Sequence, residues 1–320
     1  MALAIREQAK QRGIAAAVCL ALLCAALPAA ALADLLPAGE TARTLPITLR
    51  DGKPMLAARV GDRSGVLMVD IGTPYPLMLN RDALDLPAGR EVARGHAASG
   101  QEIVVMLHPA PSVAVAGRAM PLPDTLPSGN FGFTRDGLGA DFLGFLGFPV
   151  LAGSVFALDL GNEQGGGWLT LLATAPGAPG APPALASMLV DLSGGGLPRW
   201  QGKVGDRPMD MDIDTGDGGT FYVTERTRTA LRAGGLLNDT GARGTLTGLA
   251  LGGRVFGPIE VRLAVAGGPE DMRDPPQGDL LRLGAGFLAQ YPTLWDLPGR
   301  TIHILDPEQA GDFAWKGQRP

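Results

Sequence analysis

The chain contains very little cysteine and histidine. Of its 320 residues only Cys19 and Cys24 are cysteines, and both lie within the first 33 residues. If that segment is removed, the remaining chain has no thiol and no disulfide, which excludes cysteine chemistry as a mechanism. The histidines, His96, His108 and His303, show no paired ligand spacing, which argues against a His-based metal site and a Ser-His hydrolase.

Charge is sparse as well. Charged residues make up 18% of the sequence, and the net charge of −5 becomes −7 once the first 33 residues, with net charge +2, are left out. A protein of this sign is not expected to bind nucleic acid. The 47 glycines and 27 prolines are scattered among short runs of valine, leucine and methionine, a pattern that favours short strands and many turns.

The first 33 residues have the parts of a secretory signal peptide. A basic segment with Arg6, Lys10 and Arg12 precedes an apolar run, and Ala31-Leu32-Ala33 stands just before Asp34. This order predicts cleavage before Asp34, export to a bacterial periplasm or the cell exterior, and no membrane contact afterwards. The alternative is a retained membrane anchor over residues 13–33.

The rest of the chain repeats itself. VGDRSGVLMVDIG at residues 60–72 aligns with VGDRPMDMDIDTG at 204–216, an offset of 144 residues. Downstream, LGFPVLAGSVFALDL at 146–160 aligns with LGAGFLAQYPTLWDL at 283–297, an offset of 137 residues. Such self-similarity indicates a duplicated structural unit.

A third pair of segments, residues 115–120 and 251–256, lies between these blocks in the same order. A chain of this length suits two lobes of about 140 residues, each with its own core. We therefore predict a signal peptide at 1–33, an N-terminal lobe at 34–172, a Pro/Ala/Gly linker at 173–187 and a C-terminal lobe at 188–320.

The local patterns predict strands at Met55–Val60, Val66–Asp70, Leu77–Leu79 and Ile103–Leu107. Short helices are expected at Arg81–Leu84 and Thr224–Ala233. Asp62 and Asp206, in the identical VGDR segments, are interpreted as hairpin-turn residues without a catalytic role.

Each copy contains an apolar strand that ends in the aspartate of an Asp-x-Gly turn. These turns pair Asp70 with Gly72 and Asp214 with Gly216. If the two turns meet across a pseudo-twofold axis, the carboxyl groups share one proton, because both cannot easily stay ionised. One carboxylate then takes a proton from water as that water attacks a peptide carbonyl, while the other hydrogen-bonds the carbonyl oxygen. This chemistry needs no metal and no cofactor.

These residues resemble a known family. Asp214-Thr215-Gly216 is the aspartic-protease triplet, and Leu146-Gly147 and Leu283-Gly284 are similar to its downstream apolar-Gly element. The chain looks closest to bacterial retropepsin-like or pepsin-like aspartyl proteases with both lobes fused in one polypeptide.

The resemblance implies an all-β fold of two homologous β-barrel-like lobes with a cleft between them, covered by a hairpin flap. It also implies an extended polypeptide as substrate and a monomer whose lobes form an intramolecular pseudo-dimer. Arg94–Gln101 and Gly241–Gly248 are both candidates for the flap, and Tyr75 and Phe131 are candidates to border the cleft.

The first triplet departs from the family, since Ile71 stands where a threonine or serine hydroxyl is usual. Thr73 is expected to hydrogen-bond Asp70. Asp217, at the equivalent place in the second copy, is a third acid expected to raise the proton affinity of the pair.

The leading hypothesis is an exported aspartic endopeptidase, with Asp70 and Asp214 catalytic and Gly72, Thr73, Thr215 and Gly216 supporting them. The alternative is a catalytically relaxed bilobal scaffold that binds a peptide or protein without turnover, for which Ile71 would be the first sign.

Overall fold

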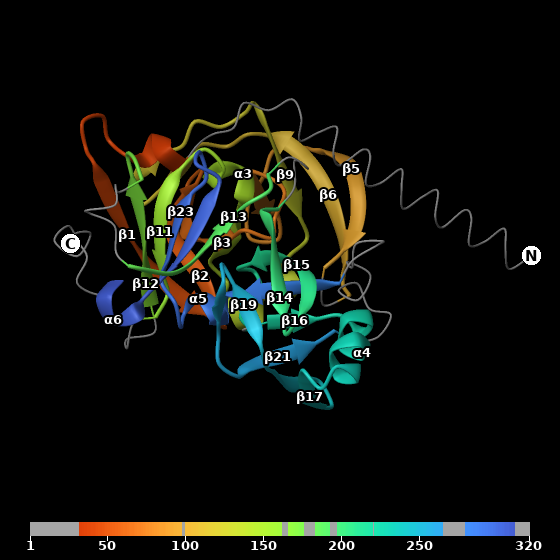
Figure 1. Ribbon diagram of the computed structural model, residues 1–320. Helices are drawn as coiled ribbons and strands as arrows, with labels where there is room; N and C mark the ends of the chain where they lie inside the picture. The colour runs from red at the N-terminus through yellow and green to blue at the C-terminus, as the bar shows by residue number, and fades with distance from the viewer. Residues whose placement is uncertain are drawn as a thin grey trace, which may run out of the picture.

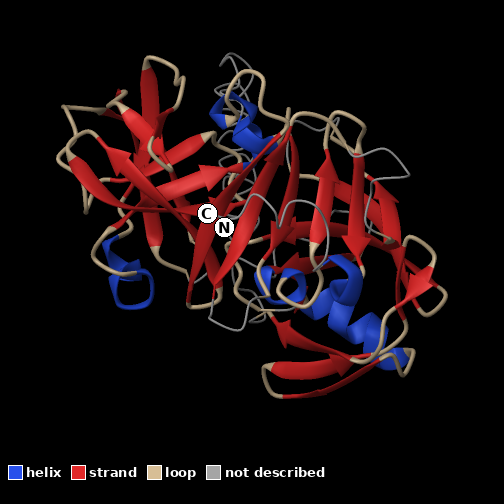
Figure 2. Cartoon of the chain, turned by 90° about the vertical axis from the view of Figure 1, so that its left-hand side faces the viewer, coloured by secondary structure: helices blue, strands red, loops and turns tan. Residues whose placement is uncertain are grey.

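The computed structural model describes residues 32–97, 100–161, 166–175, 183–192, 197–219, 221–264 and 279–310. Strands dominate the described chain and the few helices are short, which confirms the all-β prediction (Figures 1 and 2). The predicted signal peptide, apart from its last two residues, lies outside the described residues, so its cleavage stays a prediction. Within the described ranges no helix combines the length and the hydropathy that a membrane span requires.

In the first half of the chain the strands are β1 (Ala42–Arg50), β2 (Lys53–Val60), β3 (Arg63–Asp70), β4 (Leu77–Asn80), β5 (Arg90–His96), β6 (Glu102–Pro109), β7 (Val113–Val115), β8 (Arg118–Ala119), β9 (Thr125–Gly129), β10 (Phe142–Gly147), β11 (Val155–Asp159) and β12 (Gly166–Leu172). The helices here are η1 (Leu32–Leu35), η2 (Gly132–Thr134), α2 (Arg135–Leu138) and α3 (Phe148–Leu151). The four predicted strands are confirmed as parts of β2, β3, β4 and β6.

In the second half the strands are β13 (Ala184–Leu189), β14 (Arg199–Val204), β15 (Arg207–Asp214), β16 (Phe221–Val223), β17 (Leu237–Thr240), β18 (Arg243–Leu246), β19 (Leu249–Leu251), β20 (Arg254–Val255), β21 (Ile259–Leu263), β22 (Leu280–Gly284), β23 (Thr293–Asp296) and β24 (Thr301–Leu305). The helices are α4 (Glu225–Ala233), α5 (Ala285–Leu288) and α6 (Pro307–Ala310).

The described strands form two open sheets. One runs β13-β24-β23-β11-β12-β1-β2-β3-β10-β4-β9-β6-β5, with β7 beside β2 and β8 beside β7. The other runs β17-β18-β21-β16-β22-β15-β14-β19-β20. Neither of these sheets closes into a barrel, because each ends in two different edge strands among the residues described.

The repeat seen in the sequence is also a structural repeat. In the first copy β2 and β3 form a hairpin, and β10 lies parallel to β3. In the second copy β14 and β15 form the matching hairpin, and β22 lies parallel to β15. Asp62 and Asp206 occupy the two hairpin turns beside Gly61 and Gly205, whose positive φ angles suit a tight turn. The hairpin interpretation of both VGDR segments is therefore confirmed.

The predicted linker at 173–187 is partly wrong. Residues 176–182 lie outside the described chain, but β13 begins at Ala184, pairs with β24, and buries Ala186 and Met188. The Pro/Ala/Gly composition did not reveal this strand because its partner, β24, lies more than 110 residues away in the sequence.

Through β13, β24 and β23, the end of the chain completes the sheet that the first half begins. β23 pairs with β11, which joins the two halves by backbone hydrogen bonds (Figure 1). Sheet membership therefore does not follow the predicted lobe boundaries, which stay predictions.

Of the two predicted helices, one is confirmed. α4 begins after Thr224, whose side chain caps it by accepting the Thr227 N–H. Residues 81–84 form a turn instead, in which the Asp82 N–H donates to Asn80 Oδ1 and the Asp82 carboxylate accepts the Gly132 N–H. These side-chain bonds compete with a helical ladder, so no helix forms.

One large cluster of buried apolar side chains runs through both halves of the molecule. It includes Val69 and Ile71 beside the first Asp-x-Gly turn and Met211 and Ile213 beside the second. Because both turns are anchored in the same core, their positions relative to each other are set by packing.

Candidate active site

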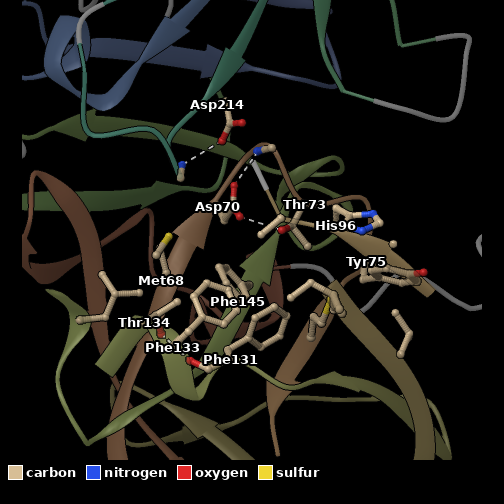
Figure 3. Close-up of a pocket in the computed structure, with 18 of the residues that line it drawn as sticks. Met68, Asp70, Thr73, Tyr75, His96, Phe131, Phe133, Thr134, Phe145 and Asp214 are labelled. Carbon is tan, nitrogen blue, oxygen red and sulfur yellow. Dashed lines mark hydrogen bonds between the residues drawn. The ribbon is translucent and has the colours of Figure 1, made fainter. Parts of the chain in front are cut away.

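Equivalent strands deliver the two aspartates. Asp70 is the last residue of β3 and pairs with Gly147 of β10, while Asp214 is the last residue of β15 and pairs with Gly284 of β22. In both copies the strand before the aspartate is buried, and the backbone turns immediately after it. The two carboxyl groups face each other where the halves of the molecule meet (Figure 3).

The two glycines hold the carboxyl groups together. The Gly72 N–H donates to Asp70 Oδ1 at 2.8 Å, and the Gly216 N–H donates to Asp214 Oδ1 at 3.0 Å. A Cβ added at Gly72 would overlap the Asp214 carboxylate, and one added at Gly216 would lie 3.0 Å from Asp70 Oδ1. Each turn therefore presses against the carboxyl group of the other half, and only glycine leaves that space free.

Thr73 contacts Asp70 as predicted: its hydroxyl donates to Asp70 Oδ2 at 2.7 Å. Asp217, at the equivalent place in the second copy, accepts the Gly219 N–H at 2.8 Å and lies 4.0 Å from the Arg262 guanidinium. The causes that shift the pKa of Asp70 do not include Asp217. Asp217 thus accepts a hydrogen bond within its own turn, and its predicted effect on the proton affinity of the pair stays a prediction.

The hydroxyl of Thr215 ties the two turns to each other. It accepts the Ile71 N–H at 2.9 Å and donates to the Val69 carbonyl at 2.6 Å. Ile71 has no hydroxyl that could make the equivalent hydrogen bonds to the second turn. Its fully buried side chain packs into the core instead. One half of the brace between the turns thus consists of hydrogen bonds and the other of apolar packing.

We expect Thr215→Val to lower the free energy of unfolding by about 1–3 kcal/mol, because two buried backbone groups lose their partner. The matched control is Thr215→Ser, which keeps the hydroxyl. Urea unfolding of both variants measures the difference. Equal stability of the valine and serine variants would show that the hydroxyl does not brace the turns.

Asp70 has a strongly perturbed charge state. Burial raises the pKa of its carboxyl to about 7, and the neighbouring Asp214 adds to the rise, while the hydrogen bonds from Thr73 and Gly72 partly oppose it. Asp70 therefore holds a proton up to neutral pH. A buried, protonated carboxyl beside a second carboxyl is the arrangement that general acid–base catalysis requires.

A cavity of about 480 Å³ opens onto both aspartates. Most of its wall is apolar and comes from the first half of the chain; Tyr75 and Phe131 line it, as predicted. Phe131 packs edge-on against Phe145 at a centroid distance of 4.8 Å. The other large apolar residues of the wall are Met68, Met78, Ile103, Val105, Phe133 and Leu138.

The hairpin of β5 and β6 forms part of the wall of this cavity. Residues 93–97 of β5 and its tip line the cavity, including Arg94 and His96 (Figure 3). The flap candidate Arg94–Gln101 lies in this hairpin, although residues 98 and 99 fall outside the described chain. The other candidate, Gly241–Gly248, belongs to the β17–β18 hairpin of the second sheet and does not line the cavity.

The sequence interpretation missed a buried ion pair beside the dyad. Arg282 of β22 contacts the Asp212 carboxylate with two hydrogen bonds of 2.8 and 2.7 Å. Its Nη1 atom also lies 3.6 Å from Asp214 Oδ2. The available signal was an arginine inside the apolar run Leu-Leu-Arg-Leu-Gly, and an aspartate two residues before Asp214, on the same face of the strand.

Solved structures with a similar fold include an aspartic proteinase. No protein-family model and no curated protein matches the chain. The aspartic proteinase from Irpex lacteus is 12% identical, with a TM-score of 0.55 over 85% of this chain and 99% of that one. Basic 7S globulin from soybean is 11% identical, with a TM-score of 0.50 over 83% of this chain and 95% of that one. At these identities the likeness shows the fold alone, which is pepsin-like.

Proposed function

We propose that this protein is an aspartic endopeptidase that hydrolyses extended polypeptides in the cleft between its two halves. The observation that carries the proposal is the pair of converging carboxyl groups, Asp70 and Asp214, each held by the N–H of its own glycine. Burial keeps a proton on one of them near neutral pH. The pepsin-like fold of the neighbouring structures agrees with this chemistry without establishing it.

In the proposed mechanism a water molecule bound between the carboxyl groups attacks the peptide carbonyl carbon. Asp214 takes a proton from the water, and Asp70 donates its proton to the carbonyl oxygen, which yields a tetrahedral diol. The proton on Asp214 then passes to the amide nitrogen, the C–N bond breaks, and the proton of one diol hydroxyl returns to Asp70. The products are a carboxylic acid and an amine, and the dyad regains its starting state.

The flap and the apolar wall define the substrate class within this proposal. A hairpin closing over an extended peptide excludes water from the reacting bond. The wall of methionine and phenylalanine side chains suits a large apolar residue next to the scissile bond. We further propose that the enzyme is exported, acts as a monomer and needs no cofactor.

The test is digestion of an unfolded protein mixture by the purified protein from pH 3 to pH 8. Cleavage is expected next to large apolar residues, and both Asp214→Ala and a statine-type transition-state inhibitor are expected to abolish it. Mass spectrometry of the fragments gives the cleavage sites.

If the folded protein cleaves nothing at any pH, the endopeptidase proposal is wrong. Binding of the statine-type inhibitor without turnover would then favour the peptide-binding scaffold, for which the absent hydroxyl at Ile71 is the specific structural reason.

A further inference from the structure

The ion pair of Asp212 and Arg282 is buried almost completely. Asp212 is 0% exposed and Arg282 is 6% exposed. The two residues stand opposite each other on the parallel strands β15 and β22, two register steps before Asp214 and Gly284. The position of the arginine is thus set by backbone pairing as well as by its two hydrogen bonds.

The fold does not require an ion pair at this place. The duplicated first half puts Met68 and Phe145 at the equivalent positions, again opposite each other on parallel strands, and both line the apolar wall of the cavity. Burying two charges costs desolvation free energy that an apolar pair avoids. The second half therefore buries a charged pair, at a cost in desolvation free energy, at a position where the first half accommodates two apolar side chains.

Burial also excludes one use of this pair. A subsite that selects charged substrate side chains has to expose its charge to the cleft, and neither Asp212 nor Arg282 is exposed enough to do so. The arginine instead faces the dyad, with Nη1 3.6 Å from Asp214 Oδ2.

We propose that Arg282 is a positioning residue that keeps Asp214 ionised and so directs the shared proton to Asp70. In this arrangement Asp212 holds the guanidinium in place, and its negative charge partly compensates the positive charge of the arginine. This inference rests on the proposed endopeptidase function. A cation within 4 Å favours the ionised form of a carboxyl group. Asp214 then acts as the base, and burial makes Asp70 the acid.

Several other charged groups lie near Asp214, and none of them is altered by substitutions at residues 212 and 282. Asp70 faces it across the cleft, Asp217 follows it in the same turn with Arg262 beside it, and Lys53, Arg94 and His96 line the cavity from β2 and the flap. Variants at 212 and 282 leave all of these unchanged.

The experiment is the pH profile of kcat/KM from pH 3 to pH 8 for the purified protein with Arg282→Gln, Arg282→Lys or Asp212→Asn. In Arg282→Gln the acid limb is expected to move up by about one pH unit, because Asp214 loses its neighbouring cation. In Asp212→Asn it is expected to move down, because the cation is less compensated. Arg282→Lys keeps the charge and is expected to keep the acid limb near that of the unchanged protein.

If Arg282 and Asp212 only supported the fold, their variants would lower kcat/KM at every pH, and the acid limb would not move up in Arg282→Gln and down in Asp212→Asn. That result would overturn the proposal. If Arg282→Gln does not fold, the double variant Asp212→Met with Arg282→Phe repeats the pair of the first half. Its acid limb is also expected to move up, and an unmoved limb in a folded double variant would contradict the proposal.

Carbon-13 NMR titration of the aspartate carboxyl groups, with Asp214→Asn to identify the signal, reads the charge of Asp214 without any substrate. An Asp214 signal that titrates at the same pH with and without Arg282 overturns the inference. If the protein cleaves nothing while this signal still responds to Arg282, the endopeptidase proposal fails and the electrostatic role of Arg282 stands.

Discussion

Replacing Asp70 with asparagine is expected to lower kcat/KM by at least about 10³-fold while making the protein more stable above neutral pH. Asparagine fits the same space and its amide oxygen still accepts the Gly72 N–H, but it has no acidic proton to donate to a peptide carbonyl. The gain in stability follows from the raised pKa of the Asp70 carboxyl, about 7 in the folded protein against 3.8 in the absence of perturbation.

The direction of the pH effect is determined by proton binding. The folded protein binds the Asp70 proton more tightly than the unfolded chain does, so this group contributes most stability below about pH 4. The contribution declines as the pH rises and is lost above about pH 7, when the buried carboxyl ionises. The loss amounts to something on the order of 4 kcal/mol.

Urea unfolding at pH 4 and at pH 8 measures this difference. The unchanged protein and Asp70→Asn are expected to be about equally stable at pH 4, and the asparagine variant is expected to be the more stable one at pH 8. Groups away from the Asp70–Asp214 pair titrate in both proteins and cancel in the comparison. A constant stability difference between the two pH values would show that the Asp70 carboxyl is not strongly perturbed.

Gly72→Ala is expected to lower kcat/KM by at least about 100-fold with little change in folding, since small misplacements of reacting groups cost rates of that size. The added Cβ would overlap the carboxylate of Asp214, and that side chain has to move away from Asp70. The backbone itself tolerates alanine, because Gly72 is not among the glycines with a positive φ angle.

The matched control is Gly95→Ala on the flap. That glycine also lines the cavity and has no positive φ angle, but a Cβ added there meets no atom within 4 Å. It is expected to keep most of its activity. Measurement of kcat/KM and of the thermal midpoint for both variants separates the two positions, and equal activities would refute the steric role of Gly72.

The sequence predicted the duplication and the paired aspartates because both depend on local patterns. A buried strand followed by Asp-x-Gly specifies its own turn, and the repeated VGDR segments specify their own hairpins. The Thr73 hydroxyl also reaches a carboxylate only three residues away. Such features need no knowledge of distant segments.

Other interpretations failed where distant segments decide the outcome. β13 lies in a segment predicted as a linker because only β24, near the chain end, makes it a strand. The turn at residues 81–84 is stabilised in part by the backbone of Gly132, about 50 residues away. Asp217 was expected near the pair from its place in the sequence, and only the structure shows that its carboxylate accepts the Gly219 N–H and lies 4.0 Å from the Arg262 guanidinium.

By itself the sequence determined an all-β, duplicated chain with a candidate acid–base pair at Asp70 and Asp214. It could do so because the alternation of apolar residues in a strand and the residues of a turn depend only on a few adjacent positions. Only the tertiary structure decided which hairpin lines the cavity, that the Thr215 hydroxyl ties the second turn to the first, and that Arg282 lies beside Asp214. Those three facts depend on contacts between segments that lie far apart in the sequence, and on burial, which a single segment does not reveal.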